Sequence, residues 1–339
     1  SDVCSSDLEE AFGQGVAYLT TCLCGILFIF GYNGLAAALR GLGDSKGPLY
    51  CVVISSVVNI VLDLVFVGVF GWEAFGAALA TVIGQGVSFA VALYYLYHRR
   101  DQVGLSFRLS ELRADRENLH LLTKIGVPQA FQLVTILVSM LFIVSRVNQF
   151  GLAASTVNGV ATKLGNICRI ITDSMGIATA AMIAQCFGAG LIERCRKTVR
   201  CTLAIGACYC GICALVIGFF PRQVFSVFTS DPEVLDYAQL YALAGAASAM
   251  GLCLRSAFNN VINGIGNAKL LLIIAMLDGV LARIGFSLLF GEALGYGLVG
   301  YWWGNCLAGY VSVLLGMIYY FSGAWKSFKL MKTPTAAAE

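Results

Sequence analysis

The stretch Cys51–Phe70 reads CVVISSVVNIVLDLVFVGVF and contains a single charged side chain, Asp63. A helix of about 20 apolar residues crosses the hydrocarbon core of a bilayer. Similar stretches recur along the whole 339-residue chain, in which 58% of the residues are hydrophobic and 12% are charged. A soluble domain carries about 25% charged residues. The sequence therefore predicts an all-α polytopic membrane protein and excludes an ordinary soluble enzyme.

Windows with few or no charges predict nine membrane-spanning helices. Their approximate ranges are 14–39, 48–70, 74–97, 125–147, 152–187, 201–220, 235–260, 270–290 and 295–321. The range 152–187 is long for one straight span, and we count it once, as a tilted or partly amphipathic helix.

The basic residues predict the orientation of these spans. Of the 22 Lys and Arg residues, 16 fall in one alternate set of connections and Arg222 alone falls in the other set. Connections rich in Lys and Arg lie on the cytoplasmic side. We therefore expect residues 98–124 and the C-terminus in the cytoplasm of a multi-pass cell-membrane protein. Because the net charge is only +3 and basic residues occur in short clusters, no nucleic-acid partner is predicted.

Two short segments indicate an internal repeat. Leu39–Lys46 (LRGLGDSK) matches Ile262–Lys269 (INGIGNAK) at an offset of 223, and Phe70–Gly76 (FGWEAFG) matches Phe290–Gly295 (FGEALG) with one residue deleted. Matching segments are expected on the same side of the membrane, which predicts two helical lobes related as parallel repeats.

The repeat predicts the domain organisation. Six spans follow residue 124 but only three precede the linker, so about a hundred residues with three spans are expected to be missing at the N-terminus. The expected parts are a polar, non-native or unassigned segment 1–10, a partial N-terminal lobe 11–97, a cytoplasmic linker 98–124, a C-terminal lobe 125–325 and a cytoplasmic tail 326–339.

Several motifs resemble the multidrug and toxic compound extrusion (MATE) family. They are Arg40–Pro48 (RGLGDSKGP), Asn59–Asp63 (NIVLD), Phe75–Thr81 (FGAALAT), Gly126–Pro128 (GVP), and Gln185–Gly190 (QCFGAG) followed by the basic Arg194–Arg200. The resemblance covers about residues 11–325 and implies twelve helices in two lobes, of which the fourth to twelfth are present. It implies a secondary antiporter that exports amphipathic, often cationic, organic compounds in exchange for Na⁺ or H⁺.

Asp63 is the sharpest candidate for a functional residue. A carboxylate within a membrane span is unfavourable and usually functional. Asn59 lies one helical turn before it, so the two side chains share a face and offer oxygen ligands to a small cation, while burial favours proton uptake by the carboxylate. By resemblance, Thr81 and Asn33 complete a cation site. Gln85 is a possible neighbour on geometry alone. The alternative is a hydrogen-bonded pair that only joins helices.

Other polar residues within spans are candidates for a substrate cavity. Gln129 and Gln132 share a face and either line a cavity or bond neighbouring helices. Asp278 and Arg283 are five residues apart, so in an α-helix they do not share a face, and we expect each to find another partner or to line a cavity. Arg169 and Asp173 have the spacing of a local ion pair.

A rival function is that of a lipid-linked oligosaccharide flippase of the same superfamily. It requires a basic cavity for pyrophosphate, to which only Lys163, Arg169, Arg255 and Arg283 can contribute. An enzyme is not expected, because no span contains His and the sequence has no phosphate-binding or hydrolase motif. We expect a monomer in the bilayer that acts on small molecules, with no cofactor except the coupling ion and no metal site except Na⁺ at Asp63.

Overall fold

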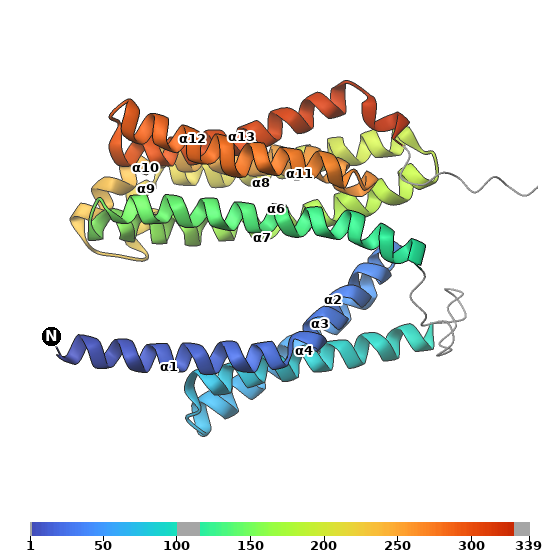
Figure 1. Ribbon diagram of the computed structural model, residues 1–339, viewed down its shortest axis with the longest axis horizontal. Coiled ribbons are helices and arrows are strands. Elements are labelled where there is room, and N and C mark those ends of the chain that lie inside the picture. Colours follow the sequence, from blue (N-terminus) through green and yellow to red (C-terminus); the bar gives the residue numbers. More distant parts are fainter. Residues whose placement is uncertain (1, 100–115, 329–339) are drawn as a thin grey trace, which may run out of the picture. The chain divides into compact units, whose positions relative to one another are not determined.

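The computed structural model describes residues 2–99 and 116–328, and the chain divides into two compact units, residues 1–113 and 114–339. Both units are built from helices, and the described residues include no β-strand (Figure 1). Within residues 2–99 and 116–328, eight helices are long and apolar enough to cross a membrane, or nine if one bent pair counts as a single span. The prediction of an all-α polytopic membrane protein is confirmed.

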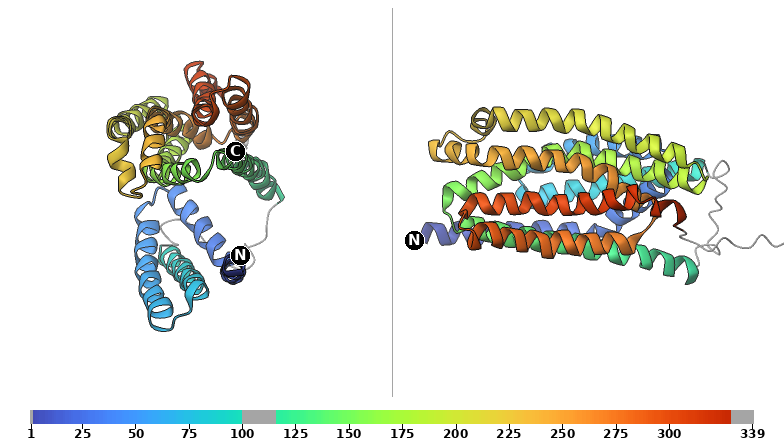
Figure 2. Two further views of the ribbon diagram at one scale, coloured as in Figure 1. Left: turned by 90° about the vertical axis from the view of Figure 1, so that its left-hand side faces the viewer. Right: turned by 90° about the horizontal axis from the view of Figure 1, so that it is seen from above.

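The described part of the first unit, residues 2–99, is built from helices (Figure 2). They are α1 (Asp2–Cys24), α2 (Ile26–Gly41), α3 (Lys46–Asp63), the π-helix η1 (Leu64–Val69), which continues α3, and α4 (Glu73–His98). Helix α4 packs against α1, α2 and α3, and therefore forms the centre of this unit.

The expected span 14–39 is bent at Gly25, where it divides into α1 and α2 with a bend of 52°. A Cβ atom at Gly25 would lie 2.5 Å from Cγ2 of Val82 on α4. Glycine thus lets α4 pack directly against the bend. Helix α1 begins at Asp2 and runs through the segment 1–10 that the sequence analysis set aside.

The second unit contains the remaining elements. They are α6 (Arg116–Asn148), α7 (Leu152–Gly188), α8 (Ile192–Phe219), α9 (Pro221–Ser226), α10 (Pro232–Ile265), α11 (Ala268–Met276), the π-helix η3 (Leu277–Ala282), α12 (Arg283–Leu288), the π-helix η4 (Leu289–Ala293), α13 (Gly297–Phe321) and the 3₁₀ turn η5 (Ala324–Ser327). Helix α7 is continuous over 37 residues, which agrees with counting the range 152–187 as one span. Residues 116–124 of the expected linker form the first turns of α6, whereas 100–115 lie outside the described residues.

Helix α10 is central to the second unit and packs against α7, α8 and α13. Many of its buried residues are small, including Ala242, Gly245, Ala249, Cys253 and Ala257. Small residues let helix backbones approach closely, which favours packing where lipid provides no hydrophobic driving force.

The first sequence repeat is also a structural repeat. Gly43 and Gly266 both adopt a left-handed conformation, with φ of 88° and 80°. The following amides make equivalent bonds, because the Asp44 N–H donates to the Leu39 carbonyl at 2.9 Å and the Asn267 N–H donates to the Ile262 carbonyl at 3.1 Å. The offset of 223 between the units is therefore maintained in the backbone.

The second sequence match has the wrong register. The left-handed Gly71 corresponds in geometry to Gly295, at an offset of 224, rather than to Gly291. The adjoining bonds agree, since the N–H of Trp72 donates to Phe66 and that of Tyr296 donates to Phe290. The second unit has thus gained one residue since the first repeat. The π-helix η3 accounts for it, because a π-helical turn accommodates an extra residue within an α-helix.

Candidate functional site

The candidate cation site of the first unit lies at the end of α3. Asp63 is the last α-helical residue and η1 begins immediately after it. Oδ1 of Asp63 and Nδ2 of Asn59 are both buried, and neither atom has a hydrogen-bond partner within residues 2–99. Buried polar atoms without partners are unfavourable, and π-helical turns frequently occur at functional sites. The end of α3 is therefore a place where a ligand would satisfy unmet bonding capacity.

Helix α4 supplies the neighbouring groups. A Cβ atom at Gly84 would lie 3.2 Å from Cβ of Asn59, so the two helices are in close contact here. Thr81 and Gln85 lie three residues before and one residue after Gly84, within one turn. The Thr81 hydroxyl donates to the Ala77 carbonyl at 2.9 Å, which leaves its oxygen able to accept or coordinate. The Gln85 Oε1 atom is buried and lacks a partner among the described residues.

Two further residues, Asn33 and Tyr18, differ in whether they interact with this candidate cation site. Asn33 on α2 is exposed, and its Nδ2 atom donates to the Ile29 carbonyl of its own helix at 2.8 Å. No hydrogen bond joins it to Asn59 or Asp63 in the described part of the unit. The phenol of Tyr18 on α1 is within electrostatic range of Asp63. The sequence contains no signal for this proximity, because it depends on how two separate helices pack.

A second carboxylate of the first unit, Asp44, has every partner it needs. Its Oδ1 accepts the N–H groups of Lys46 and Gly47 at 3.0 Å, and its Oδ2 accepts the Tyr95 hydroxyl at 2.6 Å and the Arg99 guanidinium at 3.0 Å. Burial works against the charge of Asp44, but the bonds from Tyr95 and the two amides and the charge of Arg99 outweigh it and lower its pKa. Asp44 is thus a structural acid, unlike Asp63.

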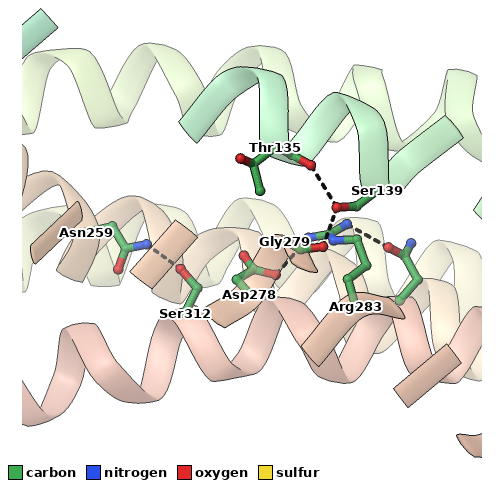
Figure 3. Close-up of polar contacts among 8 residues, drawn as sticks. Thr135, Ser139, Asn259, Asp278, Gly279, Arg283 and Ser312 are labelled. Carbon is green, nitrogen blue, oxygen red and sulfur yellow. Dashed lines mark hydrogen bonds and ion pairs between the residues drawn. The ribbon is translucent and has the colours of Figure 1, made fainter. Parts of the chain in front are cut away.

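The second unit has its own buried polar centre (Figure 3). Arg283 donates from Nη2 to Oδ1 of Asp278 at 2.9 Å and from Nη1 to Oδ1 of Asn305 at 2.7 Å. The Arg283 and Asp278 side chains are only 5% and 4% exposed. The expectation that these two residues do not share a face is wrong. Residues 277–282 form the π-helix η3, in which positions five apart are one turn apart.

Helix α6 contacts this π-helix closely. A Cβ atom at Gly279 would lie 2.9 Å from Cγ2 of Thr135, and the Ser139 hydroxyl donates to the Gly279 carbonyl (Figure 3). The pair formed by Asp278 and Arg283 is thus held between η3, α12 and α6.

Two of the cavities in the described part of the second unit contain predicted residues. The first, which we call the glutamine cavity, has a volume of about 340 Å³ and is lined by Gln129, Gln132, Asp173, Arg255 and Asp278, among others. Gln129 also donates to Oδ1 of Asn263 at 3.2 Å. Gln129 therefore both lines the cavity and bonds a neighbouring helix, the two roles that the sequence left open.

The second cavity, which we call the arginine cavity, has a volume of about 300 Å³ and is lined by Arg169, Arg255 and Arg283. The expected pair between Arg169 and Asp173 is absent from the described residues, although the two are one turn apart. Arg169 lines the arginine cavity and Asp173 lines the glutamine cavity. Of the four basic residues that a flippase would require, only Lys163 is elsewhere, 6.0 Å from the Phe228 ring.

The sequence analysis missed two polar groups of the arginine cavity. Asn305 and Trp302 are three residues apart on α13, and the indole Nε1 of Trp302 is buried without a partner in the described chain. The sequence signal that could have revealed these two groups was their spacing of three residues within an uncharged span.

Comparisons with known proteins agree with this architecture. The probable multidrug resistance protein YpnP of Bacillus subtilis (strain 168) is 28% identical over 322 residues, covering 95% of this chain and 71% of the relative. The related protein YoeA of the same organism is 29% identical over 319 residues, covering 90% and 67%. A solved MOP superfamily transporter from Pyrococcus furiosus has the same fold, with a TM-score of 0.84, 22% identity and coverage of 92% and 70%.

The chain is a multi-pass membrane transporter. This class is supported by its long apolar helices, by the polar groups within them and by these relatives. The MatE family model matches residues 6–65 and 128–289. The chain belongs to the MatE family, which confirms the resemblance stated from its motifs. Relatives named for multidrug resistance do not favour the flippase alternative.

Proposed function

We propose that the protein is a secondary antiporter that exports amphipathic organic compounds across the cell membrane in exchange for Na⁺ or H⁺. Asp63, Asn59 and Thr81 form the coupling site. The observation that carries this proposal is the pair of buried, unpartnered atoms at Asp63 and Asn59 in a family of transporters. The family resemblance implies that the compounds are often cationic, whereas the arginines of the second unit favour anionic ones.

Either coupling ion fits the chemistry of the end of α3. A carboxylate oxygen, an amide oxygen and a hydroxyl are ligands suited to a hard cation. Rotating the Asn59 amide by half a turn places its oxygen where Nδ2 now lies. Alternatively, a proton on the Asp63 carboxylate takes the place of the cation. Asn33 joins the site only if its bond to the Ile29 carbonyl is broken.

Coupling follows if ion and substrate prefer different conformations of the transporter. Neutralising Asp63 changes the free energy of its burial, so the bound and unbound forms of the site favour different states. The proposal includes the predicted orientation, with residues 98–124 and the C-terminus in the cytoplasm, and a monomer that needs no cofactor besides the coupling ion.

The test is the substitution Asp63→Asn, with Asp44→Asn as the matched control. Asparagine is nearly isosteric with aspartate but carries no charge to neutralise. In vesicles with an imposed Na⁺ or proton gradient, we expect Asp63→Asn to lose gradient-driven efflux of a fluorescent substrate while equilibrium binding of that substrate persists. Asp44→Asn keeps coupled efflux, because Asp44 serves only structural contacts.

Two results would contradict the proposal. Wild-type efflux by Asp63→Asn would exclude this residue from coupling. A loss of efflux that only parallels a loss of folded protein would show that Asp63 joins helices and does not bind the ion.

A further inference from the structure

The arginine cavity combines an apolar wall with a set of cationic groups. Helix α6 contributes apolar side chains, namely Leu133, Ile136, Met140, Ile143 and Val144. Helices α7, α10 and α12 contribute Arg169, Arg255 and Arg283, and no Asp or Glu lines this cavity among the described residues. The cavity is therefore amphipathic, and its charged groups are all positive.

Part of this positive charge has no ion-pair partner among the described residues. Arg283 is paired with Asp278. The side chains of Arg169 and Arg255 make no ion pair or hydrogen bond with any residue that the structure describes, and Nε of Arg169 is buried without a partner. Charged groups within a membrane domain are unfavourable unless a partner compensates them. Arg169 thus lacks a counter-charge in the described chain, whereas Arg255 has no contact partner but lies within electrostatic range of Asp173 and Asp278.

Hydrogen-bond donors at the cavity also lack acceptors. Besides Arg169, the Nε atom of Arg283 and the indole Nε1 of Trp302 are buried and unpartnered in the described chain. Guanidinium groups bind carboxylate and phosphate groups through paired, charge-assisted hydrogen bonds. An anionic group would satisfy both the charge and these donors.

We propose that the arginine cavity is the binding site for the anionic group of an amphipathic organic anion, whose apolar body lies against α6. The anionic group is a carboxylate or a phosphate. A volume of about 300 Å³ suits a small molecule and lies at the lower end of ligand pockets. This inference rests on the proposed function, since it names the substrate class of that transporter.

The test compares two probes with one apolar body and opposite charge, naphthoate and naphthylmethylammonium. Equilibrium binding to the purified full-length transporter is measured for the wild type, Arg169→Gln, Arg255→Gln and the control Lys163→Gln, which replaces a basic residue of α7 outside the cavity. We expect the wild type to bind naphthoate roughly tenfold or more tightly than the cation, since charge pairs in partly buried sites have effects of this order.

Each arginine variant is expected to weaken naphthoate binding by roughly tenfold, while Lys163→Gln leaves it unchanged. If a Gln variant does not fold, Arg255→Lys retains the charge but loses the planar fork, and we expect an intermediate affinity. Equal or tighter binding of the cation by the wild type would overturn the proposal. So would wild-type affinity for naphthoate in folded Gln variants.

Two further arms separate the sources of failure. In Asp63→Asn, whatever its absolute affinity, the preference for naphthoate over the cation is expected to persist, so a failure of ion coupling leaves this comparison of the two probes intact. Nanodiscs with and without phosphatidylglycerol distinguish a soluble anion from a lipid headgroup. Displacement of naphthoate by this lipid would uphold the anion site but overturn a soluble compound as its occupant.

Discussion

The two units share one backbone framework but differ in how they satisfy its polar centre. At the offset of 224 that holds beyond η3, Asn59 corresponds to Arg283, Asp63 to Ser287 and Thr81 to Asn305. In the first unit, the amide and the carboxylate leave buried atoms without partners. In the second unit, the guanidinium bonds both Asp278 and Asn305. The helix pair of the second unit thus carries a positive charge on Arg283, whereas in the proposed function a bound cation supplies it in the first unit.

The largest expected effect contrasts Arg283→Gln with Asn59→Ala. Arg283→Gln leaves buried Asp278 without its ion-pair partner, which destabilises by about 3–5 kcal/mol. Asn59→Ala removes an atom that already lacks a partner, so stability without a coupling ion changes by less than about 1 kcal/mol. Thermal unfolding of the purified proteins in one detergent measures both effects.

The same unfolding experiment with increasing Na⁺ sharpens the contrast. If Na⁺ is the coupling ion, it stabilises the wild type by mass action, and Asn59→Ala reduces this stabilisation.

The control for Arg283→Gln is Arg222→Gln, because the ion pair of Arg222 with Asp236 is exposed and contributes little to stability. If Arg283→Gln and Arg222→Gln destabilised the protein equally, the buried pair of the second unit would contribute no more than an exposed pair. That result would refute the contrast between the polar centres of the two units.

A smaller effect is expected at the corresponding glycines Gly76 and Gly300. A Cβ atom at Gly300 would lie 2.3 Å from the Phe290 carbonyl oxygen, a backbone atom that cannot move aside, whereas at Gly76 the nearest atom is Cβ of Trp72 at 2.9 Å. We expect Gly300→Ala to destabilise by about 2–3 kcal/mol and Gly76→Ala by about 1 kcal/mol. Thermal unfolding of the two variants tests the order, and the reverse order would contradict the equivalence of these glycines.

The sequence predicted those features that depend on composition along one helix. Membrane spans follow from uncharged windows, and Asp63 stands out because a charge is rare there. The break at Gly25 was not predictable, because it depends on contact with Val82 of another helix. The four-residue error in the second repeat arose because a local match of letters concealed a different backbone equivalence.

The polar centre of the second unit was predicted only in part. Asp278 and Arg283 were identified, but their pairing depends on π-helical geometry, which residue spacing cannot reveal when an α-helix is assumed. Arg169 and Asp173 have suitable spacing for a pair, yet they line different cavities, because side-chain direction depends on the surrounding helices.

The smallest expected effect concerns the loops that contain Asp44 and Asn267, which correspond at the offset of 223. Each side chain accepts an N–H of the following helix, with Asp44 accepting from Gly47 at 3.0 Å and Asn267 from Leu270 at 3.2 Å. Each also bonds a tyrosine, Tyr95 or Tyr319. The loops therefore differ mainly in that aspartate titrates and asparagine does not.

Asp44→Asn turns the first loop into a copy of the second. The folded-state pKa of Asp44 is lowered, so its contribution to stability is fully present above about pH 4 and is lost as the pH falls through the lower folded value. The variant keeps an acceptor for the helix amides but loses the charge, and we expect it to be less stable by about 1 kcal/mol at neutral pH. Hydrogen exchange at Lys46 and Gly47 reports the loop directly. The wild type should lose protection at these amides below about pH 4 after correction for intrinsic exchange rates, whereas the variant should not. Equal pH dependence in both proteins would show that Asp44 does not control the loop.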